Sequence, residues 1–126
     1  MLEKVLESVE RMFGISITEP KVEYEEIFVL KKMLEGAGIP FEFHSYLDGY
    51  HLCYPCFGEN RICSVVEHNF SYGSDSDKLE IMGLLSEAEQ QEDVGDEHSV
   101  KGYMSAQEVF DRIKLNFEKE GDVFHL

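Results

Sequence analysis

Positive charge is scarce in this 126-residue sequence, which also contains no tryptophan. Its 11 lysine and arginine residues face 26 aspartate and glutamate residues, which gives a formal net charge of −15 at pH 7. Such a chain repels DNA and RNA, because nucleic-acid affinity arises largely from cations that displace phosphate counterions. We therefore expect no direct nucleic-acid binding, whereas a basic protein surface would be attracted. The alternative is that the acidity only keeps the protein in solution.

Long apolar runs are also missing, so no segment is expected to span a bilayer. The first residues lack the basic start and the unbroken apolar stretch of a signal peptide. Cysteine is limited to three residues, an odd number that does not suit a secreted disulfide scaffold. Together these absences predict a cytoplasmic protein that does not associate with membranes.

Apolar residues, 43% of the total, are numerous enough for one hydrophobic core, and we expect a single domain over residues 1–126. Their spacing predicts an amphipathic helix over residues 2–13, within an N-terminal helical extension of residues 1–17. A second helix is predicted from an N-cap at Thr18 to the glycine-rich stop at residues 36–40.

From residue 41 the apolar pattern changes to the alternation of a β-strand. It predicts strands over residues 41–47, 50–54 and 61–67, joined by turns at Asp48-Gly49 and at residues 58–60. A buried helix is then predicted from about residue 77 to 85, followed by a mobile acidic loop over residues 86–98. The last helix begins with a capping box formed by Ser105 and Glu108.

The predicted fold is therefore α+β. It has two N-terminal helices, a three-stranded antiparallel β-meander, and two C-terminal helices packed on one face of the sheet.

Five strings of residues are distinctive. They are Phe41-Glu-Phe43, Leu47-Asp-Gly-Tyr-His-Leu-Cys-Tyr-Pro55, Ser71-Tyr-Gly73, Leu79-Glu-Ile-Met-Gly-Leu84 and Gly102-Tyr-Met-Ser-Ala-Gln-Glu-Val-Phe-Asp-Arg-Ile113. Over more than half of the chain, these strings resemble a group of small proteins encoded by phages and prophages of Firmicutes. Most members of that group have no assigned function, so the resemblance transfers no catalytic residue. It implies a mobile-element origin, in which small acidic proteins often bind host proteins.

Charge and resemblance together predict a non-enzymatic protein that binds and occludes a host protein with a basic surface. Electrostatic complementarity would speed and orient that association, and mimicry of nucleic-acid phosphates would serve counter-defence. The candidate contacts are acidic residues near the second helix and in the acidic segment: Glu23, Glu25, Glu26, Glu87, Glu89, Glu92, Asp93, Asp96 and Glu97. No cofactor is expected. A structural homo-oligomer formed through residues 2–13 is an alternative.

A second alternative is a metal-binding or enzymatic domain that uses Cys53, Cys56, Cys63 and His68. Zinc prefers four thiolate or imidazole ligands in closely spaced pairs, and only Cys53 and Cys56 have that spacing. The pair also lacks a following helix, whose N-terminus lowers the pKa of the reactive cysteine in thioredoxin-like motifs. The cysteines are therefore predicted to be free thiols, with at least Cys63 in the core and no bound metal.

Two other sets of polar residues suggest chemistry less strongly. Asp48 and Glu67 suit the metal-binding carboxylates of a restriction-like nuclease, but Asn69 occupies the position of the required lysine. His44 and His51 are predicted to face each other across the first hairpin, a cross-strand pairing that needs no catalytic role. Ser71, grouped with these histidines and His68, lacks the sequence signature of a hydrolase.

Overall fold

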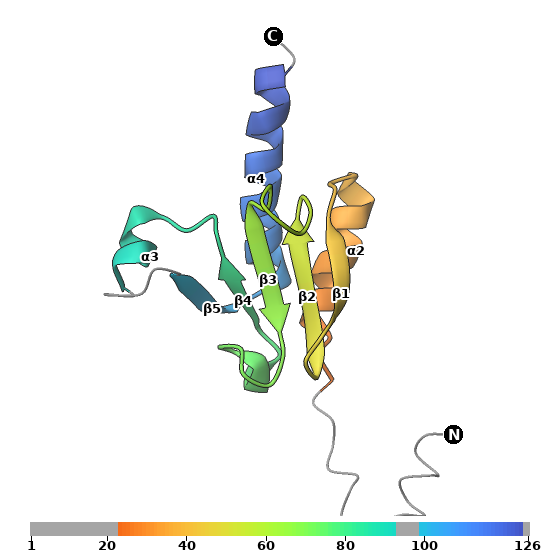
Figure 1. Cartoon of the computed structure of the whole chain (residues 1–126), viewed down its shortest axis with the longest axis vertical. Helices are drawn as coiled ribbons and strands as arrows, with labels where there is room; N and C mark the ends of the chain where they lie inside the picture. Colours follow the sequence, from red (N-terminus) through yellow and green to blue (C-terminus); the bar gives the residue numbers. More distant parts are fainter. Residues whose placement is uncertain (1–22, 93–98, 125–126) are drawn as a thin grey trace, which may run out of the picture.

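A five-stranded antiparallel sheet forms the centre of the computed structural model, which describes residues 23–92 and 99–124 (Figure 1). The strands are β1 (Glu42–Tyr46), β2 (Gly49–Tyr54), β3 (Cys63–Glu67), β4 (Leu79–Met82) and β5 (Val100–Met104). They lie side by side in sequence order, so the sheet is a meander in which each strand pairs with the next one along the chain.

Two long helices, α2 (Glu26–Ala37) and α4 (Ala106–Phe124), pack against one face of the sheet, and α4 extends beyond its end (Figure 1). A short 3-10 helix, η1 (Ser74–Ser76), lies between β3 and β4, and helix α3 (Glu87–Glu92) lies between β4 and β5. The core between helices and sheet includes Ile27, Leu30, Leu34, Leu52, Val65, Leu79, Ile81, Val109 and Ile113. Burial of these side chains is the main force that holds the two layers together.

The opposite face of the sheet is not covered by any helix in the described part of the chain, and we call it the open face (Figure 1). Side chains alternate between the two faces along each strand. On β2, for example, Leu52 and Tyr54 belong to the core, so His51 and Cys53 project from the open face.

The α+β class is confirmed, but the predicted layout is wrong. The described residues contain five strands instead of three, one long helix before the sheet and one after it. The main error is the helix predicted from residue 77 to 85, because this segment contains strand β4. Leu79 and Ile81 are fully buried, while Glu80 and Met82 between and after them are only half-buried. A short apolar run of this kind does not distinguish a buried helix from a strand, and pairing with β3 decides the outcome.

Two further boundaries differ from the prediction. The acidic segment 86–98 is not a loop throughout, since residues 87–92 form helix α3 and Ser86 and Glu89 form a capping box. Helix α2 begins at Glu26, and residues 23–25 are not helical. The predicted N-cap at Thr18 and the predicted helix over residues 2–13 lie outside the described residues.

Strands β1 and β3 lie within the predicted ranges, whereas β2 begins one residue earlier than predicted, so the turn between β1 and β2 is shifted by one residue. Its central residues are Leu47 and Asp48, because Gly49 already pairs with Tyr46. Gly49 is required for a different reason, which is the close approach of another strand. A Cβ atom at this position would lie 1.9 Å from the backbone oxygen of Glu67.

Gly49→Ala should therefore destabilise the protein by about 2 kcal/mol or more, because β2 and β3 would have to separate. The matched control is Gly36→Ala on helix α2, where a Cβ atom meets nothing within 4 Å. This control should stabilise the protein by roughly 0.5–1 kcal/mol through its higher helix propensity. Urea unfolding measures both changes, and equal stability of Gly49→Ala and the native protein would contradict this close contact.

Candidate functional site

The N-terminus of helix α2 is capped by carboxylates from distant parts of the chain. Asp77 Oδ1 accepts hydrogen bonds from the backbone N–H groups of Glu25 at 2.9 Å and Glu26 at 3.1 Å. Glu67 Oε1, at the end of β3, accepts one from the N–H of Ile27 at 3.1 Å. The first N–H groups of a helix have no partners within the helix, so these two side chains satisfy groups that would otherwise be unpaired.

Glu67 is fully buried, and its Oε2 has no hydrogen-bond partner among the described residues. Burial, and next the neighbouring Asp77 carboxyl, raise the pKa of Glu67 to about 9. Burial alone would also raise the pKa of Asp77, but the neighbouring Glu67 carboxyl and the hydrogen bonds from the α2 backbone lower it overall. At neutral pH this arrangement consists of a neutral Glu67 beside an ionised Asp77, so only one of the two capping carboxyls is charged.

Glu26 connects the two long helices. Its Oε2 accepts a hydrogen bond of 2.6 Å from the N–H of Ala106, the first residue of α4. The predicted capping box is confirmed beside it, with Ser105 Oγ accepting from the N–H of Glu108 and Glu108 Oε1 accepting from the N–H of Ser105. Glu26 therefore has a structural role, and it is only partly exposed.

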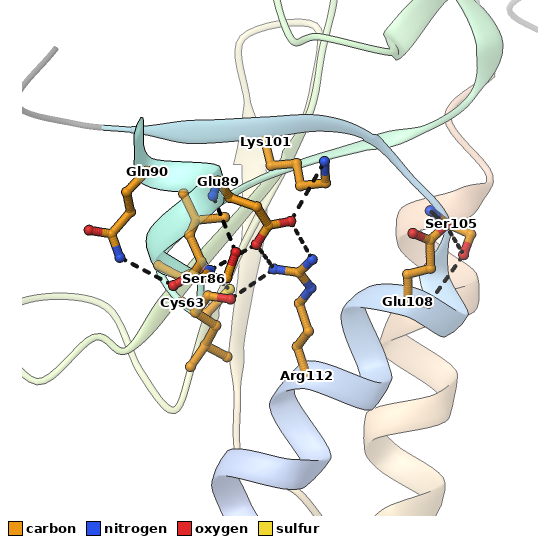
Figure 2. Close-up of polar contacts among 11 residues, drawn as sticks. Cys63, Ser86, Glu89, Gln90, Lys101, Ser105, Glu108 and Arg112 are labelled. Atoms are coloured by element: carbon orange, nitrogen blue, oxygen red, sulfur yellow. Dashed lines mark hydrogen bonds and ion pairs between the residues drawn. The ribbon is translucent and has the colours of Figure 1, made fainter. Parts of the chain in front are cut away.

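Glu89 of helix α3 also has a structural role, because it contacts Arg112 and Lys101 (Figure 2). Its two carboxylate oxygens each lie 2.7 Å from a different guanidinium nitrogen of Arg112 on α4. The Nζ atom of Lys101 on β5 lies 3.6 Å from Glu89 Oε2. The hydrogen bonds from Arg112 lower the pKa of Glu89 to about 2. Arg112 also donates to the carbonyl oxygen of Leu84, so this cluster attaches α3 and β5 to α4.

Three other predicted contact residues, Glu23, Glu25 and Glu87, are exposed, and their carboxylates form no hydrogen bond or ion pair with the described residues. The side chain of Glu92 and the whole of Asp93, Asp96 and Glu97 lie outside the described residues. Among the candidates that the structure describes, Glu26 and Glu89 therefore hold elements together, whereas Glu23, Glu25 and Glu87 are exposed.

Glu23 and Glu25 line a groove of 590 Å³ beside the start of α2 and the β1–β2 turn, and we call it the acidic groove. Its lining consists of Glu23, Tyr24, Glu25, Phe28, Asp48, Tyr50 and Asn69. Phe28 and Tyr50 form part of an aromatic cluster, with their ring centroids 4.6 Å apart. Three acidic side chains thus lie next to aromatic rings, an arrangement that suits cations through ion pairing and cation–π contact.

Asp48 is held in place within this groove. Its Oδ2 accepts the hydroxyl of Tyr24 and its Oδ1 accepts the N–H of Asn69, both at 2.9 Å. Burial alone would raise the pKa of Asp48, but these hydrogen bonds and the nearby His68 lower it. Asp48 therefore remains ionised at neutral pH. The sequence identifies it as a turn residue and as a nuclease-like carboxylate, but nothing in the local pattern indicates that it lines a groove with Glu23 and Glu25.

The four cysteine and histidine residues considered for a metal site do not converge. Cys63 projects into the core, whereas Cys53 projects from the open face, and Cys56 lies in the loop after β2. The Nδ1 atom of His68 accepts a hydrogen bond from the N–H of Phe70. Within residues 23–92 and 99–124, no group of three or more potential ligands is placed to hold a metal ion.

Cys53 and His51 lie close enough to suggest a nucleophilic pair, with 3.1 Å between Sγ and Nε2. Burial raises the pKa of the Cys53 thiol, however, and it raises that of Cys63 to about 12. Burial, and next the charges of His44, Arg61 and His68, lower the pKa of His51. A thiolate–imidazolium pair needs the opposite shifts, so Cys53 is not activated in this arrangement.

The remaining residues considered for catalysis, the histidine pair, Ser71 and Glu67, have structural explanations. His44 and His51 do face each other across β1 and β2, with ring centroids 5.3 Å apart. The Ser71 hydroxyl donates to the backbone oxygen of His68 instead of to an imidazole. Glu67, considered as a metal-binding carboxylate, is buried and neutral, as described above.

Comparisons with protein-family models, curated proteins and solved structures give no match for this chain. In the described part of the chain, every helix is too short or too polar to cross a membrane.

Glu67→Gln should remove a pH dependence of stability. Because folding raises the pKa of Glu67 from 4.5 to about 9, the folded chain keeps a proton that the unfolded chain releases above pH 4.5. The stabilising contribution of neutral Glu67 is therefore complete below this pH and is lost as the pH rises towards 9. Between about pH 5 and pH 8, the free energy of unfolding of the variant should improve relative to the native protein by roughly 1–3 kcal/mol.

Urea unfolding at the two pH values measures this difference. Glu59→Gln, which changes an exposed carboxylate in the loop between β2 and β3, is the control and should follow the native profile. Parallel profiles for Glu67→Gln and the native protein would show that Glu67 is ionised in the folded state.

The three thiols should react at different rates with a disulfide reagent at about pH 7.5. Cys53 and Cys63 are buried and have raised pKa values, whereas Cys56 is partly exposed. One fast thiol is therefore expected in the folded protein, and Cys56→Ser should abolish the fast phase. Persistence of that phase in the variant would disprove this assignment, and protection of Cys56 by added zinc would support the metal alternative.

Proposed function

We propose that this chain is a non-enzymatic protein that binds a basic segment of a host protein in the acidic groove. The carrying observation is the placement of Glu23, Glu25 and Asp48 around one groove of 590 Å³ with the aromatic side chains of Phe28 and Tyr50. Lysine and arginine side chains fit such a lining, because their charged ends pair with carboxylates and their flat or aliphatic parts contact the rings.

The net charge of −15 supports this function at long range. It would accelerate the approach of a basic partner and would suppress acidic ones, with an effect that decreases as salt screens the charges. Asp48 strengthens the proposal at short range because its hydrogen bonds with Tyr24 and Asn69 fix its position before a partner arrives. A preorganised carboxylate loses less conformational entropy on binding than a free one.

The biological role that fits these properties is occlusion of a host protein by a phage or prophage product. A partner that normally binds nucleic acid carries the required basic surface, and the carboxylates of Glu23, Glu25 and Asp48 would take the place of phosphates. Such a role places the protein in the cytoplasm and requires no cofactor. Self-association through residues 2–13 is compatible with it, because the groove residues belong to a different segment.

The direct test uses a fluorescein-labelled oligo-arginine peptide as the probe. The double variant Glu23→Gln/Glu25→Gln should weaken its binding by about threefold to tenfold in fluorescence anisotropy, because each lost charge removes a partly screened attraction. Raising the salt concentration to about 0.5 M should weaken the binding of the native protein further.

The matched control is Glu59→Gln/Glu120→Gln, which makes the same change in net charge at exposed positions outside the groove. Its affinity should remain close to that of the native protein. Equal losses in the two double variants would show that only net charge matters, and this result would refute the groove as the site. A pull-down from host lysate with the same pair of variants then tests whether a cellular partner uses the groove.

A further inference from the structure

A second hollow, of 310 Å³, lies on the open face, on the opposite side of the sheet from the helices. Its lining consists of Tyr46, His51, Arg61, Ser64, Val66, His68, Glu80, Met82 and Val100. These residues come from all five strands or from the loops that follow them. We call it the open-face hollow. Unlike the acidic groove, it is lined by more cationic or ionisable basic groups than carboxylates.

Hydrogen-bond donors from three segments meet in this hollow. His51 lies on β2, Arg61 lies in the loop before β3, and His68 follows β3. The Tyr46 ring lies close to both imidazoles, with centroid distances of 5.6 Å to His51 and 5.5 Å to His68. The two imidazoles thus share one aromatic neighbour.

Arg61 has no carboxylate partner in the described part of the chain, since it forms no ion pair there although the chain has 26 acidic side chains. One carboxylate, that of Glu80, lines the hollow, and its Oε1 accepts the N–H of Tyr72 at 3.1 Å. Glu42, on the same face of the sheet, accepts the N–H of Phe57 at 2.8 Å.

The contacts of the two histidines show which ring nitrogens they leave unused. Nε2 of His51 lies 3.1 Å from Cys53 Sγ and 2.6 Å from Ser64 Oγ, so these contacts do not use its Nδ1. His68 accepts the N–H of Phe70 at Nδ1, so the proton of its neutral ring is on Nε2. Each ring therefore retains one nitrogen that these contacts do not use.

The remaining lining is apolar. Val66, Met82 and Val100 belong to neighbouring strands, and the register places Val66 beside Glu80 and Met82 beside Val100. Their partly buried side chains form an apolar wall next to the donors. The volume of 310 Å³ lies at the lower end of the range for small-molecule sites.

We infer that the open-face hollow binds a small amphipathic anion, a molecule with one carboxylate or phosphate group attached to an aromatic or aliphatic body. The anionic group would accept hydrogen bonds from Arg61, His51 and His68, and the body would contact Val66, Met82 and the Tyr46 ring. The net charge of the chain does not prevent this, because physiological salt screens charges beyond roughly 8 Å. This site is distinct from the acidic groove, which lies on the helix-covered side, although His68 of the hollow is near Asp48 of the groove.

The test follows the imidazole nitrogens of the full-length protein by NMR during titration with phenyl phosphate, benzoate and inorganic phosphate. Phenyl phosphate or benzoate should produce saturable shifts of the His51 and His68 signals. The probe that binds more tightly shows whether the site prefers a phosphate or a carboxylate group. Inorganic phosphate should bind at least about tenfold more weakly, since it makes no apolar contacts. Binding should also raise the pKa of His51, because a bound anion stabilises its charged form.

Arg61→Gln should weaken binding by about tenfold, while Lys32→Gln, an exposed lysine on α2, should leave it unchanged. Arg61 is exposed, so its replacement should preserve the fold, and the remaining NMR spectrum checks this. His51→Ala is a second variant that should also weaken binding. The inference is overturned if neither aromatic anion gives saturable shifts at about 10 mM, if inorganic phosphate binds as tightly, or if Arg61→Gln and Lys32→Gln behave alike.

Discussion

The capping of helix α2 by Asp77 and Glu67 is the interaction on which the arrangement of this protein depends. Asp77 follows η1 and Glu67 ends β3, so their hydrogen bonds join the start of the helix to two distant parts of the chain. Glu26, in the first turn of the same helix, then caps α4. The carboxylates that position the helices on the sheet therefore also fix the acidic groove, because Glu23, Tyr24 and Glu25 immediately precede the capped turn.

This network changes how the acidity of the chain is understood. Some carboxylates, such as those of Glu26, Glu67, Asp77 and Glu89, satisfy backbone or guanidinium groups inside the fold, and one of them is neutral. Others, such as those of Glu23, Glu25 and Glu87, are exposed and available to a partner. The open face differs from both, since its hollow contains Arg61 and two imidazoles. A single value of −15 thus includes structural carboxylates, exposed carboxylates and a hollow with one carboxylate, and the two sites that we propose differ in preference for this reason.

Local signals in the sequence predicted the elements that depend on local interactions. The capping box at Ser105 and the first three strands required only short-range patterns. Strand β4 was predicted as a helix because Leu79-Glu-Ile-Met82 is short and apolar, and only pairing with β3 selects the extended form. The site could be predicted only in part. Glu23 and Glu25 were identified by charge. Tertiary packing places them in one groove with Asp48, Phe28 and Tyr50. The structural roles of Glu26 and Glu89 could not be predicted either, because their partners, Ala106 and Arg112, are far away in sequence.

The central claim is that the carboxylates divide into structural and available groups, with Glu67 neutral beneath the start of α2. Carbon-detected NMR titration of the carboxyl groups in labelled protein tests it most directly, because each side chain is observed separately. The account predicts that Glu67 remains protonated at pH 7 and titrates near 9, while Asp48 and Asp77 titrate below the ordinary range and Glu89 near 2. Titration of Glu67 near its ordinary value of 4.5 together with unshifted values for Asp77 and Glu89 would contradict it.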